Sequence, residues 1–343
     1  MRCELVALAA SSPPQLQVRT GPVPTPGRGD VLVRVEAASV NPIDLKRAGG
    51  YGRRLLSLKG AGQFPLVLGN DLAGRVEAVG PGSSNFAPGQ RVFGLVGTGR
   101  RGGSHASQAV VPQTLLRPAP DDADLVDLAV LPYSFTTMWL AVRSVGLDPS
   151  SASGKKVLIL GAAGALGRLA LQMLSGWRCC ITSISSAADA GECRRLGASV
   201  AVERGPQAIT SLPSDFDVVL NFASWTDEAA LASRLGPQAL GQATTVHPLL
   251  GHFDRLGWVQ GARASRRDKR SLEAAVHQRA PAARYAWTLF KPEPEALDAL
   301  VAGLRARQLS LPVGPCVGFD QADVAFAHVA EDRRGRAVLR PQA

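Results

Sequence analysis

The chain has little of what stabilises secreted or metal-binding proteins. Its 343 residues include only five cysteines, with no CxxC pair and no metal-ligand spacing: Cys3, Cys179, Cys180, Cys193 and Cys316. Cys179 and Cys180 are adjacent in an expected strand, where neighbouring side chains point to opposite faces, so a disulfide between them is not expected. We therefore predict a reducing, cytoplasmic location.

Long hydrophobic runs are also missing. The most apolar candidate, Leu125–Val142, is interrupted by Asp127 and Pro132, so no segment is predicted to span a membrane. The N-terminus resembles a signal peptide only weakly, because Glu4 falls where the apolar core would begin. An opening β-strand is the better interpretation.

Acidic residues are the scarcer charge, with 28 Asp and Glu against 38 Lys and Arg. A net charge of +10 can indicate a nucleic-acid partner. However, the arginines are scattered, and the densest cluster, Arg263–Arg270, contains Asp268 and no aromatic residue. We interpret this cluster as a solvated loop with a modest attraction for anionic ligands, and predict no nucleic-acid partner.

One stretch of the chain carries a recognisable nucleotide-binding pattern. Val157–Leu160 is a continuous apolar run, as expected for a strand buried in a parallel sheet, and Gly161, Gly164 and Gly167 follow it. Apolar residues then recur at three- and four-residue steps, as on one face of a helix. Strand, glycine turn and helix form half of a dinucleotide-binding βαβ unit, in which the helix N-terminus binds pyrophosphate.

The glycine turn is nevertheless degraded. In register it reads Ala162-x-Gly164-x-x-Gly167, so an alanine stands at its first position. A turn that binds nothing is the alternative interpretation. The expected cofactor contacts on this turn are Ala163, Gly164, Ala165 and Leu166.

The remaining pattern divides the chain into an α/β arrangement. Short strands punctuated by Gly and Pro up to about residue 120 predict a β-rich, barrel-like domain. Leu125–Val145 reads as one helix crossing between domains, and βαβ alternation then predicts a doubly wound parallel sheet closed by a strand near Tyr285–Phe290. The tail from Pro312 is β-like again. We expect domains at residues 1–125 and 126–290, with 291–343 returning to the first.

The order of several motifs resembles the medium-chain dehydrogenase/reductase superfamily, and in particular its zinc-free quinone oxidoreductase branch. These motifs are Ser39–Asp44, Gly69–Gly80, Pro88–Val92, Gly102–Gly103, Leu131–Pro132 with Thr137, and the glycine turn. Four further stretches resemble the reticulon-4-interacting protein group of NADPH oxidoreductases: Arg47–Tyr51, His247–Gly257, Tyr285–Phe290 and Arg334–Arg336. The resemblance implies a GroES-like catalytic domain, a Rossmann domain, cofactor in the cleft between them, and a possible homodimer.

The residues argue against zinc. Zinc-dependent alcohol dehydrogenases place a cysteine where Val40–Pro42 stands and a His-Glu pair where this chain has Asn70-Asp71. Their four-cysteine lobe is absent from Gly94–Gly103. Because a tetrahedral zinc site needs Cys or His ligands, we predict no metal and an acceptor that takes hydride without a Lewis acid, such as a quinone or enone.

Cofactor preference depends on the end of the second Rossmann strand. An NAD site needs an acid there for the ribose 2′-hydroxyl. This chain has Ser185-Ser186, with Asp189 as its first acid, while Arg204 follows the third strand. Serine hydroxyls and a guanidinium suit a 2′-phosphate, so we predict NADPH; ordinary loop chemistry is the alternative for the serines.

The resemblance implies further contacts near the nicotinamide. Asn41 and Tyr51 are the catalytic candidates. Asn41 is expected to orient the nicotinamide ring or hold a substrate oxygen, and its alternative is a turn residue before Pro42. Tyr51 is expected to donate a hydrogen bond to a quinone oxygen, and its alternatives are an aromatic lid or a turn residue. Asp44 and Thr137 are expected cofactor contacts, with packing the alternative for Thr137. The other expected contacts, with core packing as their alternative, are Phe222, Ala223, His247, Leu249, Leu250, Leu289, Phe290 and Arg334.

The sequence thus predicts a zinc-independent NADPH:quinone-type oxidoreductase. An enoyl or 2-alkenal reductase, and an NADPH-binding scaffold with little turnover, are the alternatives. The histidines form no metal or triad constellation, so a general-base role for His105 or His247 is disfavoured. Two segments are expected to be variable loops that form the pocket walls, Arg53–Gln63 and His252–Arg270.

Overall fold

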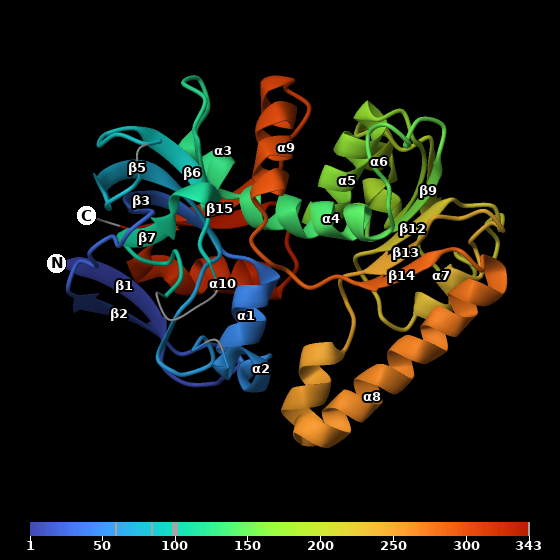
Figure 1. Ribbon diagram of the computed structural model, residues 1–343, viewed down its shortest axis with the longest axis horizontal. Helices are drawn as coiled ribbons and strands as arrows, with labels where there is room; N and C mark the ends of the chain where they lie inside the picture. Colours follow the sequence, from blue (N-terminus) through green and yellow to red (C-terminus); the bar gives the residue numbers. More distant parts are fainter. Residues whose placement is uncertain (59, 84, 98–101, 342–343) are drawn as a thin grey trace.

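The computed structural model describes residues 1–58, 60–83, 85–97 and 102–341. Figure 1 shows a β-rich half and a half built on a parallel sheet, with helix α4 (Pro132–Ser144) lying between them. Parts of the predicted Arg53–Gln63 loop and of the Gly94–Gly103 segment lie outside the described residues.

The β-rich half contains a seven-stranded sheet and a three-stranded sheet. The larger sheet has the order β15 (Val313–Gly318), β16 (Arg336–Arg340), β3 (Asp30–Ser39), β5 (Asp71–Val79), β6 (Arg91–Leu95) and β8 (Leu116–Pro118), with β7 (Gln108–Pro112) paired to β3. The smaller has the order β2 (Leu16–Gly21), β1 (Arg2–Ala7) and β4 (Leu66–Val67). The predicted opening strand is therefore confirmed, and β15 and β16 bring the C-terminal part of the chain back beside β3.

The other half is built on six parallel strands. Their order is β11 (Val200–Glu203), β10 (Cys180–Ser185), β9 (Lys156–Leu160), β12 (Val218–Asn221), β13 (Gly241–Thr244) and β14 (Arg284–Trp287). Strand β9 supplies two cores: Val157 and Ile159 belong to one hydrophobic cluster, and Leu158 and Leu160 to the other. Its apolar run is thus buried on both faces, as predicted.

Some helices pack on the two faces of the parallel sheet, and others pack on strands of the β-rich half or join the two halves. They are α1 (Pro42–Ala48), α2 (Arg53–Ser57), α3 (Leu125–Ala129), α5 (Ala165–Gly176), α6 (Ala190–Arg195), α7 (Glu228–Ala232), α8 (Leu249–Arg279), α9 (Pro294–Arg305) and α10 (Ala322–Ala330). Among the described residues, no helix is both long enough and apolar enough to cross a bilayer.

Three predictions about these helices are wrong. The single helix expected over 125–145 is two helices, because Pro132 begins α4 at its first turn. Arg53–Gln63 contains helix α2. His252–Arg270, with the Arg263–Arg270 cluster, is helical and not a loop. The buried face of α8 includes Gly261 and Ser265, so its sequence lacks the apolar periodicity by which a helix is usually recognised.

Candidate functional site at the carboxyl edge of the parallel sheet

The glycine turn after β9 is built by two glycines that admit no side chain. Gly161 has φ of +82°, and a Cβ there would lie 2.9 Å from the Cβ of Ala223. A Cβ on Gly167 would lie 2.3 Å from the carbonyl oxygen of Gly161. The tight-turn glycine is therefore Gly161, one residue before the position that the predicted register assigned to Ala162.

Gly164, in contrast, has free space around it. It is the N-cap of α5 and has no side-chain capping bond, and a Cβ there would meet only the Gly161 carbonyl oxygen, at 3.5 Å. The first-turn N–H groups of α5, on Ala165 and Leu166, have no acceptor within the helix. An uncapped helix N-terminus beside open space is suited to a diphosphate, and the accessible Ala163 lies in the same turn.

The ends of β10 and β11 bring three predicted residues together. The N–H of Arg204 donates to the Ser185 carbonyl oxygen at 2.7 Å, so the two residues are neighbours. Ser186 is exposed, and its hydroxyl donates to the carboxylate of Asp189. The side chain of Arg204 is 57% exposed, and its Nη2 lies 3.9 Å from Asp227 Oδ2.

Arg334 reaches this edge from the β-rich half. Its Nη2 donates to Asp189 Oδ1 at 2.6 Å, although its side chain is 74% exposed. Asp189, the acid that Ser186 contacts, is therefore already paired with a cation, whereas Glu203 is the strand-register partner of Ser185. The predicted residues Ser185, Ser186, Arg204 and Arg334 are consequently grouped, and Asp189 is the partner that sequence reasoning left out of the site.

His247 lies at the other end of the edge as a neutral side chain. Its ring stacks on Trp287 with centroids 5.0 Å apart, and its Nε2 is 3.1 Å from the Thr288 carbonyl oxygen. Burial lowers the pKa of His247 to about 4. Because a carbonyl only accepts, Nε2 carries the proton and the buried Nδ1 is an acceptor without a partner among the described residues.

Helix α8 connects this edge of the sheet to the β-rich half through hydrogen bonds. The carboxylate of Asp254 accepts from the N–H of Gly52 at 2.5 Å and from the N–H of Arg54 at 3.1 Å. A Cβ on Gly52 would lie 3.1 Å from Leu250 Cδ1, and a Cβ on Gly251 would lie 3.7 Å from the ring of Tyr51. The predicted Tyr51 therefore lies against the first turns of α8, where Leu249 and Leu250 are partly buried.

Tyr51 keeps its proton at neutral pH. Burial raises the pKa of its phenol, and the nearby charge of Asp254 raises it further. A protonated phenol at the contact between the two halves is a hydrogen-bond donor. This geometry agrees with a donor role and with the aromatic-lid alternative.

The wall of the site on the β-rich side is a buried polar network. Asp71 is completely buried; its Oδ1 accepts from the Ser39 hydroxyl at 2.5 Å and from Asn41 Nδ2 at 3.3 Å, and its Oδ2 accepts from the Tyr133 N–H at 3.1 Å. Burial raises the pKa of Asp71 to about 7, against the opposing effect of these hydrogen bonds. Sequence reasoning considered Asp71 only as a missing zinc ligand.

Two predicted residues lie inside this wall. Asp44 accepts from the Gly69 N–H, from Asn70 Nδ2 and, at 2.8 Å, from the N–H of Asn41. Asn41 and Asp44 both have 0% exposure. The structure therefore favours positioning roles over direct contacts, and Asn41, the N-cap of α1, matches its turn-residue alternative.

The amide of Asn41 is also oriented by the wall. Its Nδ2 donates to the Ser39 hydroxyl at 2.8 Å as well as to Asp71, while its Oδ1 is a buried acceptor without a partner among the described residues. Thr137 is 7% exposed and donates to the Tyr133 carbonyl oxygen at 2.8 Å, one turn before it in α4. That bond agrees with the packing alternative for Thr137.

Tyr133 and Arg336 are two further residues of the wall that sequence reasoning missed. The Tyr133 ring lies 4.5 Å from the ring of Phe290, and burial raises the pKa of its phenol. Arg336 donates from Nη2 to Ser134 at 3.2 Å, whereas its Nε is buried without a partner among the described residues. Both residues adjoin recognised motifs: Tyr133 follows Leu131–Pro132, and Arg336 ends the motif that begins at Arg334.

The remaining predicted residues line the edge between these groups. The Phe222 N–H donates to the Leu160 carbonyl oxygen at 3.0 Å, so Phe222 and the exposed Ala223 adjoin the glycine turn. Leu289 is 47% exposed and precedes the partly buried Phe290. Ala223 and Leu289 are exposed, whereas Phe222 and Phe290 also pack against the hydrophobic core, in agreement with their core-packing alternative.

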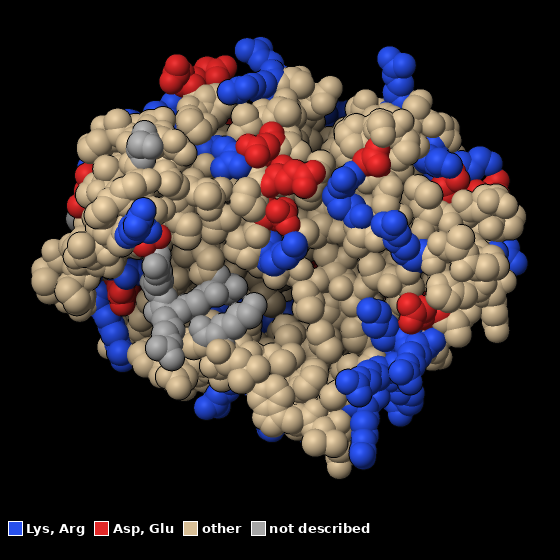
Figure 2. Space-filling model, viewed as in Figure 1, with Lys and Arg blue, Asp and Glu red and all other residues tan. Residues whose placement is uncertain are grey.

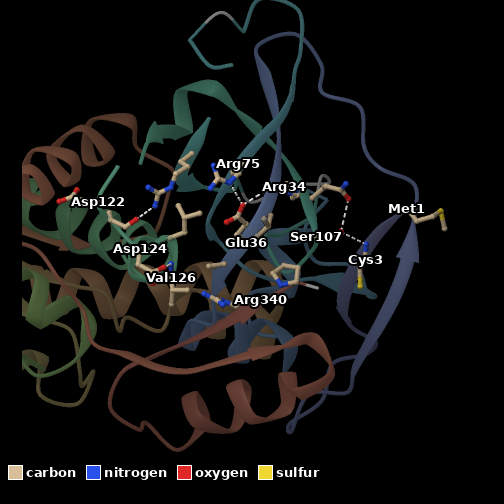
Figure 3. Close-up of a pocket in the computed structure, with 17 residues that line it drawn as sticks. Met1, Cys3, Arg34, Glu36, Arg75, Ser107, Asp122, Asp124, Val126 and Arg340 are labelled. Carbon is tan, nitrogen blue, oxygen red and sulfur yellow. Dashed lines mark hydrogen bonds and ion pairs between the residues drawn. The ribbon is translucent and has the colours of Figure 1, made fainter. Parts of the chain in front are cut away.

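A cavity of about 950 Å³ lies elsewhere, in the β-rich half. None of the predicted site residues lines it (Figure 3). Arg34 and Arg75 reach into it, but both guanidinium groups pair with Glu36, at 3.6 and 3.1 Å. Its charged lining is thus at least partly neutralised, and the cavity is not part of the nucleotide-binding edge.

Comparisons with known proteins agree with this architecture. Residues 27–121 match the model of the alcohol dehydrogenase GroES-like domain. The chain is 31% identical to the NAD(P)H oxidoreductase RTN4IP1, mitochondrial, of Drosophila melanogaster, covering 91% of this chain and 79% of the relative. It is 30% identical to the Danio rerio protein of that name, covering 90% and 83%.

Solved structures share the fold at low sequence identity. The quinone oxidoreductase of Coxiella burnetii has a TM-score of 0.81 at 18% identity, with 100% of both chains covered. The CurK enoyl reductase has a TM-score of 0.81 at 18% identity, with 99% of both covered. Mycobacterial Rv1454c complexed with NADPH has a TM-score of 0.75 at 20% identity, covering 99% of this chain and 100% of that one.

Proposed function

Because this chain belongs to the RTN4IP1 family of NAD(P)H oxidoreductases, within the medium-chain dehydrogenase/reductase superfamily, we propose that it reduces a quinone or similar conjugated carbonyl with NADPH and without a metal ion. One observation carries the proposal. The uncapped N-terminus of α5 opens on the same sheet edge as Ser185, Ser186 and Arg204, where Asp189 is already paired with Arg334.

The residues at this edge suit NADPH better than NADH. A 2′-phosphate can replace or join the Asp189 carboxylate as the partner of Arg334, and Arg204 is largely exposed beside Ser185. The diphosphate would be held by the first-turn N–H groups of α5, with Phe222 and Ala223 flanking the turn. His247 Nδ1, a buried acceptor, supports a hydrogen bond from an amide group of the cofactor.

Bound NADPH supplies a hydride from its nicotinamide ring. Reduction of a carbonyl then requires a donor at its oxygen, and the Tyr51 phenol retains its proton at neutral pH because burial and Asp254 raise its pKa. Tyr133, beside Phe290, is a second phenol at this wall. The buried Asn41–Asp71 network keeps the wall fixed, so that little reorganisation is needed during the reaction.

Zinc independence rests on the ligand types present. Among the residues that the structure describes, no group of three His, Cys, Asp or Glu side chains is placed to hold a metal ion. The chain has Asn70 where zinc enzymes need an imidazole, and the carboxylate of Asp71 already accepts hydrogen bonds from Ser39, Asn41 and Tyr133. We expect NADPH oxidation with a simple quinone to survive exhaustive chelation; one zinc per chain by elemental analysis would contradict the proposal.

An enoyl reductase is the second candidate, supported by the shared fold of the CurK enzyme. The same hydride would reach the β-carbon of an unsaturated thioester. Parallel assays of NADPH oxidation with a quinone and with an enoyl thioester separate the two. Cofactor binding without oxidation by either acceptor would favour the NADPH-binding scaffold instead.

Three further features remain part of this proposal. We place the domain boundaries at 1–125, 126–290 and 291–343, and we expect a homodimer by analogy. The cytoplasmic location stays a prediction from the cysteines, since the Drosophila and Danio relatives carry the word mitochondrial in their names. The described cysteines are all free.

A further inference from the structure

Helix α8 presents a charged outer face that is exposed. Beyond a kink at Gly257, which has φ of +77° and ψ of −172°, its inner side buries Gly261, Ser265 and Val276. Four exposed residues lie on the opposite side at steps of four, three and four: Val259, Arg263, Arg266 and Arg270. Such spacing aligns them along one face of the helix.

The kink also exposes large apolar side chains. Leu256 and Trp258 are each 44% exposed and Val259 is 63% exposed. The Trp258 ring meets Phe253 edge-on at 5.7 Å, which holds it in place at the tip. Leu58, 73% exposed, ends helix α2, which packs against α8. Neighbouring apolar residues with this much exposure indicate an interaction surface.

Positive charge surrounds this apolar tip. From Trp258 to Arg279, helix α8 carries six Lys and Arg residues against two acids, Asp268 and Glu273. Asp268 is half-buried and faces His252, with its oxygen 3.4 Å from Nε2, besides pairing with Arg267. Figure 2 shows blue side chains gathered along this helix at the lower right of the molecule.

We propose that the α8 surface, defined as Leu256, Trp258, Val259, Arg263, Arg266 and Arg270, docks on an anionic lipid bilayer. Tryptophan and aliphatic side chains partition into the headgroup boundary, and arginines on the same helix bind lipid phosphates. A second copy of the chain is a poorer occupant, because two arginine stripes facing each other repel. RNA is also poorer, because the stripe has no aromatic residues interleaved for stacking bases.

Docking would place the substrate side of the enzyme near the bilayer. The first turn of the same helix carries Leu249 and Leu250 and adjoins Tyr51. Long-tailed quinones dissolve in bilayers, so a docked enzyme would meet an acceptor that water does not carry. This extension rests on the proposed quinone activity, whereas the docking itself does not.

The test is co-sedimentation of the full chain with vesicles of phosphatidylcholine, with and without phosphatidylglycerol. The parent should bind only the anionic vesicles. Each arginine near a bilayer contributes roughly a fivefold increase in partitioning, so R263Q/R266Q/R270Q should bind about a hundredfold more weakly at low salt. V259D should weaken binding several-fold. The matched control R19Q/R28Q/R305Q removes three exposed arginines elsewhere and should bind like the parent.

Several results would overturn the docking proposal: equal binding by all variants, equal binding to neutral vesicles, or no binding by the parent. Binding of an RNA oligonucleotide that only R263Q/R266Q/R270Q loses, without vesicle binding, would assign the surface to nucleic acid. A parent dimer that V259D dissociates, again without vesicle binding, would make it a self-contact.

Activity separates this proposal from the proposed function. Oxidation of NADPH by a water-soluble quinone should be the same in the parent and both α8 variants, while a long-chain quinone embedded in vesicles should be reduced more slowly by the variants. Vesicle binding without NADPH oxidation by either quinone would support the docking proposal and contradict the proposed quinone activity.

Discussion

The two ends of the nucleotide-binding edge are constructed in opposite ways. At the wall of the β-rich half, Asn41, Asp44 and Asp71 are completely buried and hydrogen-bonded to the protein itself. At the phosphate end, Arg204 and Arg334 are 57% and 74% exposed and each lies near a single acid.

This difference in exposure decides which property of the protein each charged group affects. Exposed ion pairs contribute little by themselves, because water and salt screen them, so Arg204 and Arg334 become important only when a phosphate binds. Buried groups have lost their water and depend on their protein partners. Changes in the wall should therefore alter stability and its pH dependence, and changes at the phosphate end should alter cofactor affinity and its salt dependence.

The largest effect is expected at the turn between these ends. Gly164→Val adds a side chain to open space beside the uncapped α5, so the protein should fold while NADPH affinity falls by more than roughly a hundredfold. Fluorescence titration measures the affinity and circular dichroism the fold. Gly21→Val, at a glycine whose added Cβ would have no neighbour within 4 Å, is the matched control. Unchanged titration by Gly164→Val would remove the cofactor from this turn.

A change in the wall should appear in stability against pH. The pKa of Asp71 is raised from 3.8 to about 7, so the folded protein holds this proton more tightly than the unfolded chain. Its contribution is thus fully present below about pH 4 and declines as pH rises to about 7, by roughly 2–4 kcal/mol. Asp71→Asn should remove that decline from denaturant-unfolding curves.

Asp320→Asn, at an exposed position, is the control for this effect and should keep the parent's pH profile. Equal dependence of stability on pH in the parent and in Asp71→Asn between about pH 4 and 7 would contradict the buried-proton interpretation of Asp71.

At the phosphate end the clearest change is in cofactor preference. Each charge-assisted hydrogen bond contributes roughly 1.5–3 kcal/mol, so the parent should prefer NADPH by about tenfold to a few hundredfold. Ser185→Asp should reverse this, because a carboxylate repels the 2′-phosphate and accepts from a free 2′-hydroxyl. Titrations of both cofactors measure it, and equal affinities in the parent would mean that the pocket is misassigned.

Removing the one exposed cation Arg204 should change cofactor affinity less than Ser185→Asp does. Because the Arg204 side chain is 57% exposed, we expect Arg204→Ala to weaken NADPH binding by only about threefold to tenfold and NADH binding hardly at all. The difference should shrink in high salt, as screening requires. Arg19→Ala, at a distant exposed site, is the control. A parallel loss of both cofactors would point to a structural role for Arg204.

The smallest effect concerns the contact that joins the two halves. Asp254→Ala removes the acceptor of the Gly52 and Arg54 N–H groups. Arg54 is exposed and its N–H can bind water instead, whereas Gly52 is buried and its N–H loses its partner. We expect kcat/KM for a quinone to fall by about twofold to fivefold, with cofactor affinity unchanged. Steady-state kinetics at saturating NADPH measure this, and a loss of cofactor affinity would show that α8 supports the nucleotide edge directly.

Several features of the fold and of the site could be predicted from the amino-acid sequence. The apolar run of β9 and the glycines after it predicted a buried parallel strand and its turn, because both patterns are local. The order of motifs predicted the family, the GroES-like domain and the α/β class, which the comparisons confirm. The grouping of Ser185, Ser186 and Arg204 also followed, since neighbouring parallel strands end at one edge.

Other features required contacts between distant segments. The part of α8 from His252 to Arg270 was predicted as a loop because its buried residues, His252, Gly261 and Ser265, are small or polar, and only the packed structure shows that they are internal. The first position of the glycine motif was assigned to Ala162 and not to Gly161, because the spacing of glycines does not show which of them has a positive φ.

The sequence alone determined which chemical groups are available: a nucleotide turn, serines without an acid, arginine in excess, and no set of zinc ligands in the expected positions. Only the tertiary structure decided which of them can meet a ligand. It buried Asn41 and Asp44 in a wall with Asp71, and left Arg204 and Arg334 in water. Burial is set by segments far apart in the chain, and it is burial that fixes the protonation, partners and reach of each side chain.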